Sequence, residues 1–135
     1  MVCNTIDKVR HIFVYGSLIS AYTMQEELGI SDQLRWVQAF CIQGSLYHLG
    51  EYPGAVLENE GGLIQGELYE ILEEDCLKIL DQYEGFDSLK QRQSLFIRQV
   101  IRDYSVPFYI YVYNQSVKTV PCIEDGDWVK ANRQI

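Results

Sequence analysis

The chain has 135 residues, of which 47% are hydrophobic and 22% charged, a composition typical of one soluble domain with a buried core. Its formal net charge of −8 and its eleven scattered Lys and Arg residues argue against nucleic acid as a partner, because a phosphate backbone requires clustered cations. No run of about 18 apolar residues exists, so no membrane helix is predicted. The first seven residues lack an apolar signal core, and we expect a single cytoplasmic domain over 1–135.

The cysteines and histidines give little support for a metal site or a catalytic relay. No Cys-x-x-Cys pair occurs, and metal ligation requires tighter spacing than the four cysteines have. Two of them, Cys41 and Cys76, lie in apolar patterns and are predicted to be small buried thiols. With only His11 and His48 present, neither a zinc site nor a Ser-His-Asp relay is easy to assemble. Any chemistry therefore rests on a carboxylate and backbone amides.

The first predicted element is a strand that begins at His11 and stops at a Gly16-Ser17 turn. Its consecutive apolar residues indicate a strand buried on both faces. Gly16 permits unusual backbone angles, so successive N–H groups after the strand can point at one spot and hold a carboxylate or an oxyanion. An ordinary core strand followed by a turn has the same pattern, so this stretch alone leaves both interpretations open.

The middle of the chain alternates between extended segments and turns. Residues 20–28 favour a short helix or a structured loop, because Ser20 can cap a helix and Gly29 can end one. Gly44 interrupts a long apolar segment and indicates a bulge or a close backbone approach. Strands are predicted at 34–49, 55–57 and 63–71, with turns at 50–54 and 58–62.

The clearest helix is predicted over about 73–84. Four residues spaced i, i+3, i+4 and i+7 form its apolar face, and these are Cys76, Ile79, Leu80 and Tyr83. Acidic residues favour its N-terminal end, and Gly85 suits its C-terminal cap.

The last third of the chain favours strands again. Residues 95–103 alternate in polarity, which places Arg98 and Arg102 on a solvated strand face, and 107–113 is a strongly aromatic strand. Residues 123–128 are predicted to form a turn packed by Trp128. The pattern predicts an α+β fold: a small, barrel-like arrangement of five to seven mixed strands with one main helix and short extra helices.

Four stretches in this order resemble the gamma-glutamyl cyclotransferase-like family, and in particular its small gamma-glutamylamine cyclotransferase branch. They are FVYGSL at 13–18, GSLYHLGEYPG at 44–54, GELYEI at 66–71 and LDQYEG at 80–85. The resemblance implies a small mixed β-barrel with a cavity at one end and no cofactor. It implies that a small-molecule gamma-glutamyl substrate is held at Tyr15, Gly16, Ser17 and Leu18, and that Glu84 acts as general acid and base.

The chain departs from the family pattern at three places. Ile19-Ser20 follows the turn where relatives often carry a basic residue, Gly54 replaces a usual Ala, and Phe96 replaces an expected Tyr. These positions are expected to reshape the pocket for the leaving group, so the sequence does not name the leaving amine. The oligomeric state is also not indicated.

The implied reaction is an intramolecular cyclisation that releases 5-oxoproline and an amine. The substrate's own amine attacks its γ-carbonyl, so no protein nucleophile is required. Glu84 can move the protons if the helix dipole and an aromatic cavity raise its pKa. The amides of residues 16–18 would hold either the oxyanion or the substrate's α-carboxylate. By position, Tyr52, Phe108 and Tyr113 are predicted to line the cavity and exclude water.

Two alternatives remain open at the level of sequence. The first is a binding module that keeps the cavity without turnover, which the three departures motivate. The second is a gamma-glutamyl hydrolase or deacylase, which would release glutamate instead of 5-oxoproline. A carboxylate in the cavity favours an enzyme over a pure binder, because binding alone does not require one.

Overall fold

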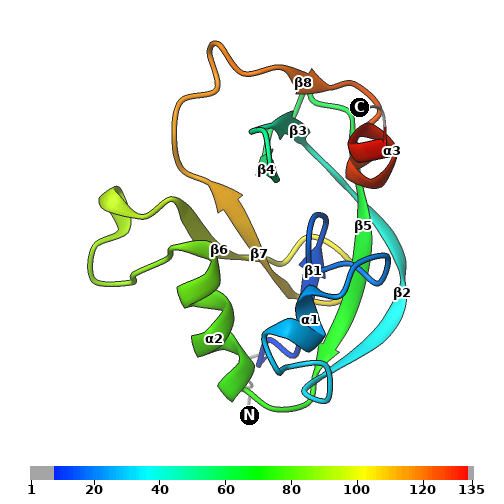
Figure 1. Ribbon diagram of the computed structural model, residues 1–135, viewed down its shortest axis with the longest axis vertical. Coiled ribbons are helices and arrows are strands. Elements are labelled where there is room, and N and C mark those ends of the chain that lie inside the picture. The colour runs from blue at the N-terminus through cyan, green and yellow to red at the C-terminus, as the bar shows by residue number, and fades with distance from the viewer. Residues whose placement is uncertain (1–7, 134–135) are drawn as a thin grey trace.

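The computed structural model describes residues 8–133 as a mixed α+β fold with eight strands in two sheets and three α-helices (Figure 1). The strands are β1 (His11–Val14), β2 (Leu34–Gln43), β3 (Ser45–His48), β4 (Pro53–Val56), β5 (Leu63–Ile71), β6 (Phe96–Ile101), β7 (Phe108–Tyr113) and β8 (Cys122–Ile123). The helices are α1 (Met24–Glu27), α2 (Asp75–Glu84) and α3 (Trp128–Arg133), with a 3₁₀ turn at Gln91–Gln93. Among these residues no helix is long and apolar enough to cross a membrane.

The larger sheet has the strand order β2-β5-β1-β7-β6, and the smaller one β4-β3-β8. β1 lies at the centre of the larger sheet, antiparallel to β5 and parallel to β7. The prediction of a barrel is not confirmed, because no ladder in residues 8–133 joins the edge strands β2 and β6. The chain instead leaves the larger sheet at Gly44 and starts the smaller one. A Cβ atom there would lie 2.8 Å from the carbonyl oxygen of Val56, so the break requires glycine.

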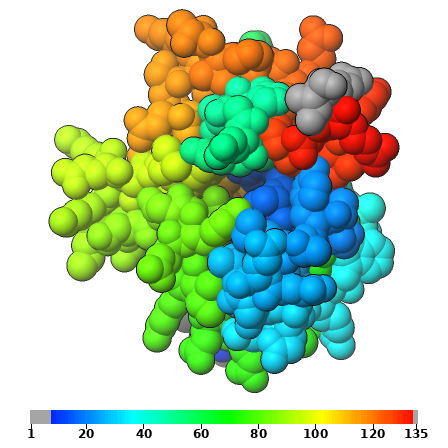
Figure 2. All heavy atoms as spheres, viewed as in Figure 1, coloured from blue at the N-terminus to red at the C-terminus, as the bar shows by residue number. Residues whose placement is uncertain are grey.

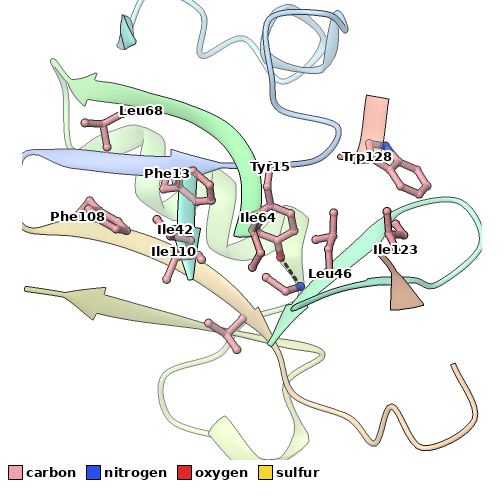
Figure 3. Packing of buried hydrophobic residues seen from close by; sticks show 12 residues of the cluster. Phe13, Tyr15, Ile42, Leu46, Ile64, Leu68, Phe108, Ile110, Ile123 and Trp128 are labelled. Atoms are coloured by element: carbon pink, nitrogen blue, oxygen red, sulfur yellow. Dashed lines mark hydrogen bonds between the residues drawn. The ribbon is translucent and has the colours of Figure 1, made fainter. Parts of the chain in front are cut away.

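Both faces of β1 are buried, as the apolar run predicts. Phe13 packs into one cluster between the two sheets, together with Leu46, Ile64 and Phe108 (Figure 3). Ile12 and Val14 point the opposite way into a second cluster beneath α2. Side chains alternate along a strand, so the three buried residues of β1 divide between the two cores.

The main helix α2 ends where the sequence predicts and begins two residues later, at Asp75. Gly85 adopts a left-handed conformation with φ of 71°, and its N–H caps the carbonyls of Asp81 and Gln82. Only Cys76 and Leu80 of the predicted apolar face are fully buried. The helix therefore ends abruptly, with its last residue at the edge of the second core.

Several local predictions are wrong in detail. Residues 20–28, expected as a short helix or a structured loop, form a loop with one helical turn at Met24–Glu27, and the strand expected over 34–49 is two strands. Cys41 is exposed, because the alternation of β2 points its neighbour Ile42 into the core. The C-terminal turn predicted over 123–128 begins at the last residue of β8, Ile123, and buried Trp128 begins α3.

The hydroxyl of Tyr15 joins the two sheets. Tyr15 follows β1 directly, is buried, and donates a hydrogen bond of 2.6 Å to the carbonyl oxygen of Tyr111 in β7. The same hydroxyl accepts a bond of 3.2 Å from the backbone N–H of Ala55 in β4, the dashed line in Figure 3. Ala55 is fully buried, so its N–H cannot form a hydrogen bond with solvent instead.

Replacement of Tyr15 with Phe is expected to lower the free energy of unfolding by about 1–3 kcal/mol, because it leaves the buried Ala55 N–H unpaired. Denaturant titration measures the loss. Tyr109→Phe in β7 is a matched control, because its hydroxyl has no hydrogen-bond partner among residues 8–133. Equal stability of the two variants would contradict the role of the Tyr15 hydroxyl.

Candidate active site

A cavity of about 170 Å³ opens beside Tyr15, whose hydroxyl links the two sheets. Five elements contribute to it: β1 and the loop after it, the start of β4, the end of α2, the start of β6, and β7. Figure 2 shows the blue N-terminal segment, the teal β3–β4 segment and the green α2 segment meeting on one face of the molecule. The lining residues are Phe13, Val14, Tyr15, Gly16, Ser17, Leu18, Tyr52, Pro53, Tyr83, Glu84, Leu95, Phe96 and Tyr111.

The loop after β1 presents unused backbone donors. The N–H of Ile19 bonds to the carbonyl of Gly16 at 3.2 Å and closes a tight turn. The amides of Gly16, Ser17 and Leu18 have no acceptor within residues 8–133, although all three residues line the cavity. The carbonyl of Leu18 accepts a bond of 2.6 Å from Gln25. Three consecutive free N–H groups in a fixed loop can bind a carboxylate or an oxyanion.

Close packing sets the loop against the smaller sheet. A Cβ atom on Gly16 would lie 2.9 Å from Cγ of Pro53, the first residue of β4, so any larger residue would push the two segments apart. The glycine therefore keeps one wall of the cavity against the loop.

Glu67 anchors the loop from the other side. Its carboxylate accepts bonds from the Ser20 N–H at 2.7 Å and the Ser20 hydroxyl at 2.6 Å. The Tyr69 hydroxyl donates a third bond at 3.0 Å. Burial, followed by the charge of Glu67, raises the pKa of Tyr69 to about 12, so the phenol keeps its proton. Ser20, one of the positions at which the chain departs from the family pattern, is therefore held by Glu67. The sequence analysis did not single out Glu67, although it lies in a matched stretch.

Glu84 is the last residue of α2 and, among residues 8–133, the only charged side chain that lines the cavity. Its carboxylate has no hydrogen bond or ion pair to the part of the chain that the structure describes. Burial raises its pKa from 4.5 to about 8, because the charged form loses hydration without gaining a partner. Glu84 therefore exchanges a proton near neutral pH.

Arg98 is not on a solvated face, which corrects the sequence prediction. Its Nε lies 3.1 Å from Asp81 Oδ1, and its guanidinium stacks over the ring of Tyr109 at 4.8 Å. Asp81 also accepts a bond of 2.6 Å from the hydroxyl of the cavity residue Tyr111. This network ties α2 to β6 and β7 one turn before Glu84. Periodicity within β6 gave no signal for it, because the partner lies on another element.

The aromatic wall differs from its prediction. Tyr52 lines the cavity, and its ring lies 6.0 Å from that of Phe96. Tyr113 is not among the lining residues and packs behind Phe96 at 5.4 Å. A Cβ atom on Gly54 would lie 2.9 Å from Cβ of Tyr113, so glycine makes room for this ring. Phe108 is fully buried in the core between the sheets and does not reach the cavity.

Tyr83 is a lining residue that the sequence analysis assigned to the helix core. It is 38% exposed, and its hydroxyl lies 2.7 Å from Oγ of Ser17, in hydrogen-bonding contact. The helix thus touches the loop directly at the cavity.

The chemistry available to this site is narrow. Within residues 8–133, no Lys, Arg or His lines the cavity, and no group of three or more His, Cys, Asp or Glu could hold a metal ion. What the described residues supply is one proton-exchanging carboxyl, three free amides and an apolar wall. This set suits proton transfer on a substrate that carries its own negative charge.

The chain is similar to a known family and to solved structures. Residues 12–130 match the family described as gamma-glutamyl cyclotransferase, AIG2-like. The gamma-glutamylcyclotransferase family protein YtfP of Escherichia coli K12 is 33% identical over 126 residues, covering 90% of this chain and 98% of that protein. The solution structure of ytfP from Escherichia coli has a TM-score of 0.65 at 32% identity, covering 90% and 98% of the chains. An AIG2-like protein from Mus musculus, 21% identical with a TM-score of 0.66 and coverage of 85% and 86%, shares the fold.

The buried carboxyl predicts an unusual dependence of stability on pH. Because the pKa of Glu84 is about 8 in the folded chain and near 4.5 in the unfolded chain, the folded state holds an extra proton between these values. Stability from this group is therefore present below pH 4.5 and is lost as pH rises to 8. Glu84→Gln is expected to be more stable than the wild type at pH 9, on the order of 1–3 kcal/mol, and similar at pH 4.5.

Thermal melts of both proteins across this range measure the difference. Glu73→Gln, an exposed residue just before the same helix, is the control and should not change the pH dependence. A Glu84→Gln curve parallel to that of the wild type would contradict the raised pKa.

Proposed function

We propose that this chain, which belongs to the gamma-glutamyl cyclotransferase, AIG2-like family, converts a gamma-glutamyl amine or amide to 5-oxoproline and a free amine. The family and the names of its relatives identify a gamma-glutamylcyclotransferase-like enzyme. The observation that carries the finer proposal is the cavity in which the carboxyl of Glu84, with its raised pKa, lies with three free amides of the loop 16–18.

The reaction would proceed within one bound molecule. The substrate's α-amine attacks its own γ-carbonyl carbon, a C–N bond forms, and a five-membered ring closes through a tetrahedral oxyanion. The bond from this carbon to the leaving nitrogen then breaks. The reacting groups are tethered, so the enzyme gains most by folding the substrate into the reactive shape. This agrees with a cavity that offers no Cys, Lys or His nucleophile among its lining residues.

Glu84 would move the proton between the two nitrogens. As a carboxylate it takes a proton from the attacking amine, and as a carboxylic acid it gives one to the leaving nitrogen. A single group serves both steps best when its pKa lies near the working pH, and the value of about 8 meets this condition. The remaining proton of the original ammonium leaves with the solvent or with the released amine.

The amides of residues 16–18 would bind the substrate's α-carboxylate. With no cation in the lining, these N–H groups are the donors best able to compensate a buried negative charge. Tyr52, Leu95 and Phe96 would form the apolar wall that excludes water. Exclusion of water favours ring closure over hydrolysis, and this argues for 5-oxoproline rather than glutamate as the product.

Glu84→Gln is expected to keep the fold and to lower kcat by at least about 100-fold, because Gln cannot exchange a proton. In the wild type, kcat/KM is expected to rise with pH through about 8 as the base form appears. Mass spectrometry of products from a panel of gamma-glutamyl compounds measures both, with Glu73→Gln as the matched control. Glutamate as the product would identify a hydrolase, and binding without any product would identify a non-catalytic module. Full activity of Glu84→Gln would contradict the assigned role.

The leaving amine is expected to lack a carboxylate. A second negative charge in the apolar part of the cavity would find no cation and would be repelled by Glu84. We expect kcat/KM for a gamma-glutamyl alkylamide or anilide to exceed that for the matching gamma-glutamyl amino acid by about 10-fold or more. Steady-state kinetics on such a pair, matched in size, measures the ratio. A ratio near one would contradict an apolar leaving-group pocket.

A further inference from the structure

Tyr83 connects the two parts of the cavity that carry its chemistry. It immediately precedes Glu84 in α2, and its hydroxyl lies 2.7 Å from Oγ of Ser17, in the loop with free amides. Both side chains line the cavity. Tyr83 is 38% exposed, whereas Leu80 on the same helix is fully buried.

The chemistry of the two hydroxyls favours Tyr83 as the donor. The distance allows either atom to donate. A phenol with an ordinary pKa of about 10 is a far better donor than an aliphatic hydroxyl. Burial raises the pKa of the Tyr83 phenol, the bond with Ser17 partly offsets this, and the charge of Glu84 raises it further, so the phenol keeps its proton.

This direction leaves the Ser17 proton free. Each hydroxyl has one proton to donate, and Oγ of Ser17 has no other partner in the part of the chain that the structure describes. An accepted bond from Tyr83 fixes the Ser17 rotamer, and a hydroxyl that accepts one bond becomes a better donor for the next. The Ser17 proton then adds to the donors of the three neighbouring amides.

We propose that Tyr83 is a positioning residue, which fixes the Ser17 hydroxyl as a fourth donor to the carboxylate of the bound ligand. The inference rests on the proposed function in taking that ligand to be a gamma-glutamyl carboxylate. Tyr83 acts through Ser17, whereas proton transfer belongs to Glu84. Loss of the Tyr83 hydroxyl therefore weakens binding of the ligand and leaves the chemical step unchanged.

The test is a double-mutant cycle of Tyr83→Phe and Ser17→Ala, with 5-oxoproline as the probe because it carries the same carboxylate and requires no turnover. Titration calorimetry on the intact chain gives the Kd. Tyr83→Phe is expected to raise Kd about 3- to 10-fold, the effect of one hydrogen bond. In the Ser17→Ala background the same substitution should have no further effect. Kinetics should show the same factor in KM, with kcat within about twofold.

Tyr22→Phe is the matched control. Its hydroxyl accepts a bond of 3.1 Å from Asn132, and the residue does not line the cavity, so Kd and KM should stay at the wild-type values. Melting temperatures of all variants report whether the fold is kept. A merely structural role for Tyr83 would lower the melting temperature without splitting KM from kcat.

The outcomes separate this inference from the proposed function. An unchanged Kd in Tyr83→Phe, an equal effect in both backgrounds, or no binding of 5-oxoproline by the wild type would each overturn the role of Tyr83, even if the wild type turns over substrate. Binding that depends on Tyr83 only when Ser17 is present would support it, even if no 5-oxoproline is ever produced.

Discussion

The position of the cavity depends on one buried hydroxyl. Tyr15 bonds to β7 of the larger sheet through Tyr111 and to β4 of the smaller sheet through Ala55. No backbone ladder joins the two sheets within residues 8–133, and this hydroxyl bonds to both of them beside the core cluster that they share. Next to this hydroxyl, Pro53 of β4 packs directly against Gly16. The loop with free amides follows a strand of the larger sheet, Pro53 of the facing wall belongs to the smaller sheet, and the Tyr15 hydroxyl links the two sheets beside the cavity.

The polar groups of the cavity that have no hydrogen-bond partner in the described chain lower the stability of the fold. Within residues 8–133, the carboxyl at the end of α2 and the three nearby amides have no hydrogen-bond partner, so the fold itself does not compensate their desolvation. A bound carboxylate would satisfy the amides, and a proton satisfies Glu84. Such local deficits are typical of sites that must bind and react, and the surrounding core supports them. Because α2 ends at Gly85, the carboxyl without a hydrogen-bond partner in the described chain belongs to the last residue of the helix, Glu84.

The sequence predicted those elements whose structure is determined by residues close together in the chain. The run at 11–14 and the period of 73–84 gave a strand buried on both faces and the main helix, and the turn after β1 was placed correctly. Failures arise where a partner far along the chain decides. Cys41 faces outward because its alternation is set against β5, and Tyr113 moves behind Phe96 because Gly54 makes room. Glu67 and Tyr83 acquire their contacts only when sheet and helix meet the loop, so periodicity gives no sign of them.

Contacts between residues distant in the sequence also set the charges around the end of α2. Arg98 lies on β6 near the end of α2, and a free guanidinium beside Glu84 would stabilise the carboxylate and lower its pKa. Asp81 instead binds that guanidinium at 3.1 Å, and the ring of Tyr109 covers its face. Asp81 also accepts a hydrogen bond from the hydroxyl of Tyr111, and burial together with Asp81 raises the pKa of this phenol, so it stays neutral at the cavity wall. One carboxylate of α2 therefore neutralises the nearby cation, and burial alone sets the acidity of the second, one turn later.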